Sequence, residues 1–467
     1  MELTKSNGES GGMTSSSSRS DHSLLPLHKA AFEGNVRELA AFLRQGDDVA
    51  QKDKHGNTAL HIAVMLGHKE CVQILLAHGA PVKAKNLKGW STLAESISYG
   101  DRPTIISLFR KSKQQIREQM SSRRPHLIKA LERIQDFYME LKWDFQSWVP
   151  LVSRILPSDI CKIYKRGSSI RLDTTLLDFN DMKWERGDIS FVFNGNHVHH
   201  KIGGGNNNYS PLVVMDNKLK VFQLMTNKES EMEFDDEIDL LMSSSDIIVA
   251  QLVTKEVQFA RSQSGWIFRE DKWEMVGPFK SEVYGVSGIS LDTRKRREHL
   301  SEEDLQKNKE LNIESLTKSS PSNFELSSDD YNRRESLPPP PRPEITWDEY
   351  ILAEPGSPPH LGRPQMCKTS SKAFKATMAM SEDFPMTVEM LLNILEIVTP
   401  FKHLKKLREF VTMKLPPGFP VKIEIPILPT ITAKITFQEF EFRDNLAEEN
   451  FQIPSDYCEK RNRFPDL

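Results

Sequence analysis

Three histidines near the middle of the chain are the residues whose type best fits metal chemistry. His197, His199 and His200 lie in the run "HVHHKIGGGNNN", and neutral imidazole is a common ligand of transition metals. No carboxylate or cysteine follows at a metal-ligand spacing, and the glycines and asparagines are typical of a loop. We therefore expect no metal site at these residues.

The cysteine positions and the missing catalytic motifs argue against an enzyme. Cys71, Cys161, Cys367 and Cys458 are too far apart for a C-x-x-C zinc or redox motif. The sequence contains no G-x-S-x-G, H-E-x-x-H, H-R-D or D-F-G run, and no G-x-x-x-x-G-K-[ST] phosphate loop. We expect no catalytic residues and no bound cofactor.

Glycines, leucines and histidines instead recur at a fixed interval near the start of the chain. The positions 33 residues apart are Leu27, Leu60 and Leu93, then Gly34, Gly67 and Gly100, and the pair His28 and His61. This period, together with the run "TALHIA", which is close to T-P-L-H-x-A, predicts three ankyrin repeats of a turn and two helices. The third copy has Ala94 in place of histidine, and terminal repeats often differ in this way. The pattern indicates a module that binds other proteins.

Composition excludes some partners and locations. The net charge of −3 gives no reason to expect nucleic acid as a partner, because nucleic-acid-binding proteins usually carry a basic face. Residues 1–23 are polar and rich in serine and glycine, which predicts a disordered tail and not a signal peptide. The longest apolar run, "VEMLLNILEIV", is shorter than the roughly 20 residues of a membrane-spanning helix. We expect no transmembrane helix.

Hydrophobic periodicity predicts a multidomain α+β protein. A helical stripe that includes Leu127, Leu131 and Ile134, preceded by Pro125 in a first turn, predicts capping helices after the repeats. From Ile170 the period becomes two, which is typical of strands, and strand-like alternation returns near the end of the chain. We expect the late strands to pair with the earlier ones. The predicted fold is a short all-α ankyrin-repeat solenoid followed by a mainly antiparallel β-rich domain with helices and a disordered insertion.

The predicted segments have the following boundaries. They are a disordered tail at residues 1–23, three ankyrin repeats at 24–110, capping or connecting helices at 111–168, the first part of the β-rich domain at 169–293, a disordered linker or insertion at 294–343, and the second part of the β-rich domain at 344–467.

Three charged or proline-rich runs have more than one interpretation. The basic run from Arg294 has the composition of a nuclear address, but we favour a short exposed helix within the linker. The acidic run from Glu229 is expected to be a solvated loop or strand edge. Ser336 is a candidate phosphorylation site, and it precedes a proline run at Pro338 that is either a partner ligand or a stiff spacer.

Several long runs resemble one known family. They are the ankyrin block and "LKWDFQSWVPLVSRILPSDICKIYKRGSSIRLDTTLLDF", "RKRREHLSEEDL", "FKATMAMSEDFP" and "PFKHLKKLREFVTMKLPPGFPVKIEIP". Together they resemble the ankyrin repeat domain-containing protein thirteen family, and most closely its C-type branch, which shares the ending "RFPDL". The resemblance covers nearly the whole chain from about residue 24.

The resemblance implies a non-enzymatic chaperone or adaptor for the biogenesis of G-protein-coupled receptors and their exit from the endoplasmic reticulum. Its place would be the cytosolic side of that membrane, as a peripheral protein, and the cytosol. Other family members carry ubiquitin-interacting helices, but no such segment follows Phe437, so we do not expect ubiquitin as a partner. The alternatives are an endocytic or trafficking adaptor without ubiquitin-interacting motifs, or a lipid-binding β-domain protein.

Four apolar residues of the repeats are candidates for partner binding. Phe32, Met65 and Tyr99 lie one or two positions before the repeated glycines, and Trp90 lies in a turn. Together they predict an apolar strip that binds an extended or helical receptor segment. The alternative is that these residues pack internally, against the helix from Pro125 or the β-rich domain.

A basic segment is the candidate for membrane contact. Lys402, Lys405, Lys406 and Arg408 are expected to lie opposite the apolar face of a short helix that begins at Phe401. Basic amphipathic helices bind anionic membranes. The alternative is a helix packed on the β-rich domain with its basic face in solvent.

Overall fold

A computed structural model describes most of the chain after residue 24. The described residues are 25–149, 156–180, 183–195, 212–225, 231–244, 246–254, 256–265, 269–301, 303, 306, 335–398, 415–428, 430–460 and 463–464. The predicted disordered tail, the histidine-rich loop, most of the predicted insertion and the basic segment from Phe401 lie outside the described residues.

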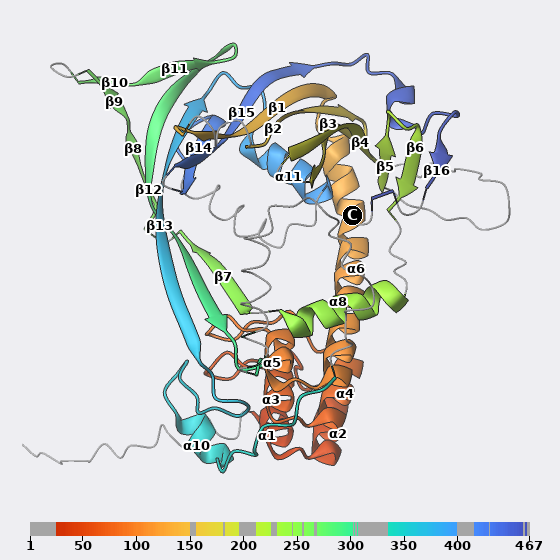
Figure 1. The fold of residues 1–467 in the computed structure, drawn as a ribbon, viewed down its shortest axis with the longest axis vertical. Coiled ribbons are helices and arrows are strands. Elements are labelled where there is room, and N and C mark those ends of the chain that lie inside the picture. Colours follow the sequence, from red (N-terminus) through yellow and green to blue (C-terminus); the bar gives the residue numbers. More distant parts are fainter. Residues whose placement is uncertain are drawn as a thin grey trace, which may run out of the picture.

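The first described part of the chain is a helical stack (Figure 1). Its helices are α1 (Pro26–Glu33), α2 (Val36–Gln45), α3 (Ala59–Met65), α4 (Lys69–Ala77), α5 (Thr92–Tyr99) and α6 (Arg102–Glu132). The first helices of the repeats, α1, α3 and α5, pack in one row, and α2, α4 and α6 pack in a second row. This arrangement confirms the predicted ankyrin solenoid.

The repeated histidines join each repeat to the next one. His28 Nε2 lies 3.2 Å from the carbonyl oxygen of Asn57, and His61 Nε2 lies 3.2 Å from that of Trp90. Ala94 stands at the corresponding position of the third repeat, which is followed by α6 and not by another repeat turn. Ala94 instead shares an apolar cluster with Phe234. Alanine suits these apolar surroundings better than a polar imidazole would.

Helix α6 connects the stack to the rest of the molecule. It runs without interruption from Arg102 to Glu132, so residue 110, the predicted end of the repeats, lies within this helix, and the predicted helix start at Pro125 is wrong. Pro125 lies inside the helix, where it cannot donate the usual backbone hydrogen bond. The end of α6 lies beneath the sheet (Figure 1), where Leu131 belongs to the core.

Two strands lie where the sequence predicted helices. β1 (Phe137–Ser147) and β2 (Ser158–Arg166) form an antiparallel pair within residues 111–168. The short apolar run at residues 134–141 fits both the helical and the strand period. Ile134 and Leu141 suit a helix, whereas Phe137 and Met139 alternate as in a strand. This run forms a strand and not a helix because it pairs with a strand from the end of the chain.

The remaining strands extend this sheet. They are β3 (Ser169–Asn180), β4 (Lys183–Asn194), β5 (Leu212–Asp216), β6 (Val221–Leu224), β7 (Ile247–Val253), β8 (Gln258–Arg261), β11 (Trp273–Val276), β12 (Phe279–Arg296), β13 (Cys367–Ser381), β14 (Phe419–Leu428), β15 (Ile431–Phe442) and β16 (Cys458–Glu459). Two short strands, β9 (Gln263–Ser264) and β10 (Glu270–Asp271), form a separate hairpin.

Within the described residues the strand order is β11-β12-β13-β14-β15-β1-β2-β3-β4-β5-β6-β16, and β7 and β8 also pair with β12. All these pairs are antiparallel except β16 with β6. The late strands β13 to β15 therefore lie between β12 and β1, which confirms that the end of the chain joins the earlier strands.

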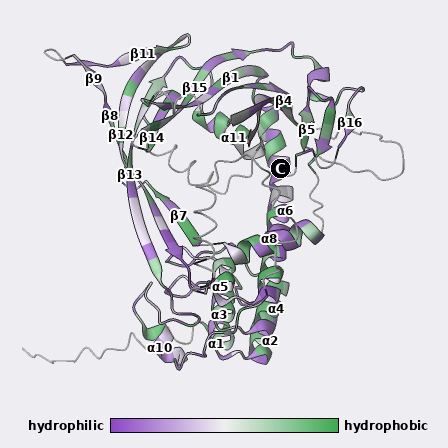
Figure 2. Ribbon diagram, in the orientation of Figure 1, coloured by the Kyte–Doolittle hydropathy of each residue, from purple (hydrophilic) through white to green (hydrophobic). Residues whose placement is uncertain are grey.

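A core rich in phenylalanine lies beneath the curved sheet. Helix α11 (Val388–Val398) and the end of α6 lie against this side of the sheet, and Figure 2 shows α11 as mainly hydrophobic. The rings of Phe384 and Phe419 stack 4.1 Å apart, and Phe437 packs edge-on against Phe419. These residues come from β14, β15 and the loop before α11, so the core forms only when the late strands join the sheet.

The predicted linker of residues 294–343 is too long at both ends. Strand β12 continues to Arg296, and residues 335–343 run along the ankyrin stack. The acidic run, expected as a loop, contains helix α8 (Glu231–Ser243), which packs on α5 and α6. Its apolar residues Phe234, Ile238 and Met242 follow helical spacing, so a helical interpretation was open from the sequence. None of the described helices is long and apolar enough to cross a membrane.

Candidate functional site: the inner-helix face of the ankyrin stack

The four predicted partner-binding residues do not form one exposed strip. Phe32 and Met65 contact a later segment of the same chain. Tyr99 is half-buried with its ring over Gly67, where a Cβ atom would lie 2.0 Å from the Tyr99 hydroxyl. Trp90 is only 1% exposed and belongs to a different apolar cluster. Internal packing, the alternative left open by the sequence, describes the surroundings of Phe32, Met65 and Trp90.

The segment that covers Phe32 and Met65 consists of residues 335–365, which we call the strap. It crosses the ends of α1, α3 and α5 and the loop at residues 53–57, which together we call the inner-helix face. The strap contains one short helix, α10 (Trp347–Leu352), which lies beside α1 (Figure 1). Thr346 and Glu349 form a capping box at its start, and this T-x-x-E spacing is the signal in the sequence that could have predicted the helix.

Two aromatic residues of α10 anchor the strap. Trp347 is 7% exposed and Tyr350 is fully buried. Both rings lie against Phe32, with ring centroids 5.6 and 5.7 Å away, and aromatic pairs at such separations are attractive. On the ankyrin side, Met65 and Ile62 belong to the same apolar cluster as the two rings.

The buried hydroxyl of Tyr350 is fully hydrogen-bonded. It donates to Asp53 Oδ2 at 2.6 Å and accepts from Asn57 Nδ2 at 2.9 Å. His55 Nε2 lies 3.0 Å from the backbone oxygen of Tyr350. Burial, reinforced by the Asp53 carboxylate, raises the pKa of Tyr350 far above its ordinary value, so the hydroxyl stays a donor at physiological pH.

Polar contacts hold both ends of the strap. At the start, Ser336 Oγ accepts a hydrogen bond from the backbone N–H of Arg102 at 3.0 Å, and the Leu337 N–H donates to the Gly100 oxygen at 2.8 Å. At the end, Arg363 Nε donates to the backbone oxygen of Ser98 at 3.0 Å.

A buried ion-pair cluster joins the stack to the end of β12. Arg296 is fully buried and forms two 3.0 Å hydrogen bonds with the carboxylate of Glu95, while Glu298 pairs with the same guanidinium. Its guanidinium carbon lies 4.7 Å from the Trp90 ring centroid, a cation–π contact. Burial opposes the charge, but the two carboxylates hold the pKa of Arg296 above its ordinary value. The short exposed helix predicted for the basic run from Arg294 is therefore wrong at this residue, because Arg296 is buried and ends β12.

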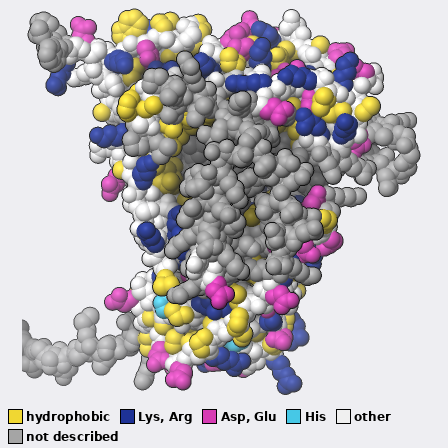
Figure 3. Space-filling model, viewed as in Figure 1, with side chains coloured by type: hydrophobic (Ala, Val, Ile, Leu, Met, Phe, Trp, Pro, Cys, Tyr) yellow, Lys and Arg dark blue, Asp and Glu magenta, His cyan; other side chains and the backbone are white. Residues whose placement is uncertain are grey.

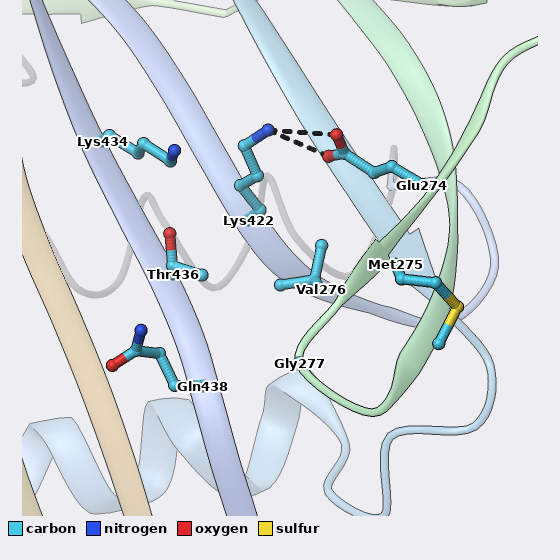
Figure 4. Close-up of a pocket in the computed structure, with 8 residues that line it drawn as sticks. All are labelled: Glu274, Met275, Val276, Gly277, Lys422, Lys434, Thr436 and Gln438. Atoms are coloured by element: carbon cyan, nitrogen blue, oxygen red, sulfur yellow. Dashed lines mark hydrogen bonds and ion pairs between the residues drawn. The ribbon is translucent and has the colours of Figure 1, made fainter.

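A polar hollow of about 220 Å³ lies between β11 and the strands β14 and β15. Figure 4 shows Lys422 pointing toward Glu274, and the lysine Nζ lies 3.0 and 3.1 Å from the two carboxylate oxygens. Lys422 also pairs with Glu424 at 3.0 Å. These charges satisfy one another, and their polarity does not favour an apolar ligand in this hollow.

The described residues include no metal-binding cluster, and the thiol of Cys71 is buried. Over this part of the chain, no group of three or more His, Cys, Asp or Glu side chains is placed to hold a metal ion. Burial raises the pKa of the Cys71 thiol to about 11, so the reactive thiolate is disfavoured there. The predicted membrane-contact residues Lys402, Lys405, Lys406 and Arg408 lie outside the described residues.

The described part of the face shown in Figure 3 has a mixed surface. Acidic and basic side chains are interspersed on it, and hydrophobic side chains lie between them. The mixture agrees with the small net charge of −3.

Comparison with known proteins places both parts of the chain. A family model described as "ANKRD13 C-terminal" matches residues 171–464, and a model of three ankyrin repeats matches residues 27–119. The chain is 58% identical over 442 residues to Ankyrin repeat domain-containing protein 13C of Homo sapiens, covering 95% of this chain and 79% of that protein.

The chain is also similar to a second 13C protein and to a 13B protein. The chain is 56% identical to Ankyrin repeat domain-containing protein 13C-B of Xenopus laevis, over 97% of this chain and 86% of that protein. It is 36% identical to Ankyrin repeat domain-containing protein 13B of Mus musculus, over 88% of this chain and 67% of that protein. Because the ankyrin repeats, the C-terminal family model and these relatives all match, the chain belongs to the ANKRD13 family, and it is more similar to the 13C proteins than to the 13B protein.

Proposed function

We propose that the protein is a non-enzymatic adaptor that acts as a chaperone for immature G-protein-coupled receptors at the cytosolic side of the endoplasmic reticulum. Family membership supports the adaptor role, since ankyrin repeats generally present surfaces for protein partners. The observation that carries the proposal is the inner-helix face, where residues of three repeats together hold a peptide segment through aromatic and polar contacts.

Proximity labelling of living cells tests this proposal. The full chain fused to a biotin ligase should label receptors that still carry the immature glycans of the endoplasmic reticulum, and these receptors should co-precipitate with the chain. The ligase alone, expressed at the same level, is the control. Labelling only of mature surface receptors and of endocytic coat proteins would support the alternative trafficking adaptor instead.

Peripheral membrane contact through the basic segment is a separate part of the proposal. Replacing Lys405, Lys406 and Arg408 together by glutamate should reduce flotation with vesicles that contain anionic lipids, because each basic residue near such a surface contributes about 1 kcal/mol. Replacing the exposed Lys372 of β13 by glutamate is the matched control. Unchanged flotation of the triple variant would mean that a protein partner, and not lipid, tethers the chain.

A further inference from the structure

We propose that the inner-helix face is a peptide-binding surface that the strap occupies in cis, and that a client segment of the same chemistry binds there by displacing the strap. This inference rests on the proposed adaptor function, because it names the surface and the kind of segment that a client would offer. The occupant expected is a short helical turn with an aromatic residue, a tyrosine three positions later and a downstream arginine.

The inner-helix face has the features of a peptide-binding interface. The strap places two buried aromatic anchors, Trp347 and Tyr350, against residues from separate repeats, and such central aromatic anchors supply most of the energy of many interfaces. The buried tyrosine hydroxyl is also hydrogen-bonded, by Asp53 and Asn57. An aromatic segment without that hydroxyl would remove the hydrogen bonds to Asp53 Oδ2 and Asn57 Nδ2, at a cost in binding free energy.

Apart from the backbone bond of Leu337 to Gly100, the strap is held by contacts that involve side chains and not by a strand ladder. Its described residues pair with no strand, and its regular structure is the six-residue helix α10. The capping box of Thr346 and Glu349 stabilises this turn locally, without contribution from the ankyrin side. A segment with its own local stability and side-chain anchors can be exchanged without breaking the sheet, since β13 begins only at Cys367.

The spacing of the anchors defines the client. Trp347 and Tyr350 are three residues apart, so one helical turn places both rings on the same face. Thirteen positions after Tyr350, Arg363 reaches the carbonyl oxygens of Ser98 and Tyr99 at the end of α5. Gly362 lies close to Met65, where a Cβ atom would be 3.1 Å from the Met65 oxygen, so the segment before the arginine must run close to α3.

Tethering explains how the strap regulates access. A covalently linked segment competes at an effective concentration on the order of millimolar, so a free peptide of equal intrinsic affinity is largely excluded. The apparent affinity for that peptide is reduced by the fraction of molecules in which the strap is released. Weakening the strap should therefore strengthen binding of the peptide in trans.

A fluorescent peptide with the sequence of residues 343–365 provides the probe, and the full-length chain is the receptor. Replacing Trp347 and Tyr350 together by alanine in the chain should tighten binding of the peptide at least tenfold compared with the unaltered chain. Leu352→Ala, at a 63% exposed position of the same helix, is the matched control and should leave the affinity unchanged. Adding Asn57→Ala to the double variant should weaken peptide binding again.

Tyr350→Phe provides a variant that keeps the ring and removes only the hydroxyl bonded to Asp53 and Asn57. The wild-type peptide should then bind the chain several-fold more tightly, because the peptide retains the hydroxyl that the strap has lost. If Tyr350→Phe retains its thermal unfolding midpoint to within a few degrees and peptide affinity does not rise, the face is only part of the core and the inference fails.

The peptide assay is separate from the receptor assay. Peptide binding that follows the expected pattern, without any change in receptor co-precipitation, would keep the peptide-binding surface but reject receptors as its clients. Loss of peptide binding in every variant, with receptor co-precipitation intact, would keep the proposed function and reject this surface.

Discussion

Arg296 and Arg297 are neighbours in one basic run, yet the fold treats them differently. The side chain of Arg296 is fully buried between Glu95 and Glu298, whereas that of Arg297 is 52% exposed and pairs with Asp246. A buried charge needs its partners, because desolvation of an unpaired ion is costly. Loss of the exposed Arg297 costs less, because Lys295 also pairs with Asp246 at 3.4 Å.

This difference predicts unequal effects of the same substitution. Arg296→Ala leaves two carboxylates buried without their cation and should lower the free energy of unfolding by about 3–5 kcal/mol. Arg297→Ala, the matched control, should cost less than about 1 kcal/mol. Urea unfolding followed by circular dichroism measures both, and equal losses would contradict the assigned burial.

The repeat histidine His61 predicts a pH dependence. Burial lowers the pKa of His61 to about 4, and burial also lowers the pKa of His28. The folded protein thus favours neutral imidazole, so this stability is complete above the unfolded pKa of about 6.5 and is lost as the pH falls toward 4. For His61 the full loss is roughly 3 kcal/mol, from about 1.4 kcal/mol per pH unit.

Urea midpoints at pH 7 and pH 4.5 test this dependence. The unaltered chain should lose stability at the lower pH, and His61→Gln should lose less of it, although its stability at pH 7 is lower because the contact with the Trp90 oxygen is removed. Replacing the exposed His126 by glutamine is the control. If His61→Gln retains the full dependence on pH, other groups cause the acid sensitivity.

At the scale of elements, α8 covers the last repeat of the stack by packing on α5 and α6. Arg102, in the first turn of α6, forms an ion pair with Asp239 of α8, and both side chains are largely buried. The apolar side of α8 fills the position that a fourth repeat would cover. Most acidic residues of α8, unlike Asp239, lie on its exposed side, and an interpretation based on their charge alone missed the helix.

Two aliphatic residues of α8 test its packing. Ile238 is fully buried against the repeats, whereas Leu240 is 63% exposed on the same helix. Ile238→Ala should lower the free energy of unfolding by about 2–5 kcal/mol because it leaves a cavity. Leu240→Ala should change it by about 0.5 kcal/mol or less. Thermal unfolding of the two variants compares them directly, and similar midpoints would mean that α8 does not pack as described.

At the scale of the whole molecule, the sheet is built from distant parts of the chain. β12 pairs with β13 and β15 pairs with β1, so both strands that flank the late block come from before residue 300. The phenylalanine core depends on the same association. The protein should therefore tolerate a break between residues 306 and 335, because the pairing on both sides of this segment persists.

Fragment complementation checks this expectation. Residues 1–306 and 335–467, co-expressed with a tag on one fragment, should co-purify as a stoichiometric complex. Phe437→Lys, which places a charge in the core, should abolish the complex, whereas Glu439→Lys at an exposed position of β15 should not. Separate elution of the unaltered fragments would refute assembly through the sheet.

The sequence alone determined the features that repeat at short range. The 33-residue period identified the ankyrin helices, and alternation identified β3, which begins next to Ile170, and the late strands β14 and β15. These patterns are local, because helices and strands bury one face at a period set by their own geometry. The absence of catalytic motifs and the family resemblance also came from the sequence, and the comparisons confirm the family.

Only the tertiary structure decided which distant residues meet. Arg296 pairs with Glu95 across 201 positions, and Tyr350 bonds to Asp53 across 297 positions. Neither partner has a local pattern that identifies the other, so a basic run looked exposed and an apolar strip looked free. The same limit explains β1, where an ambiguous apolar run became a strand through pairing with β15. Burial of these residues follows from long-range association, which periodicity along the chain does not encode.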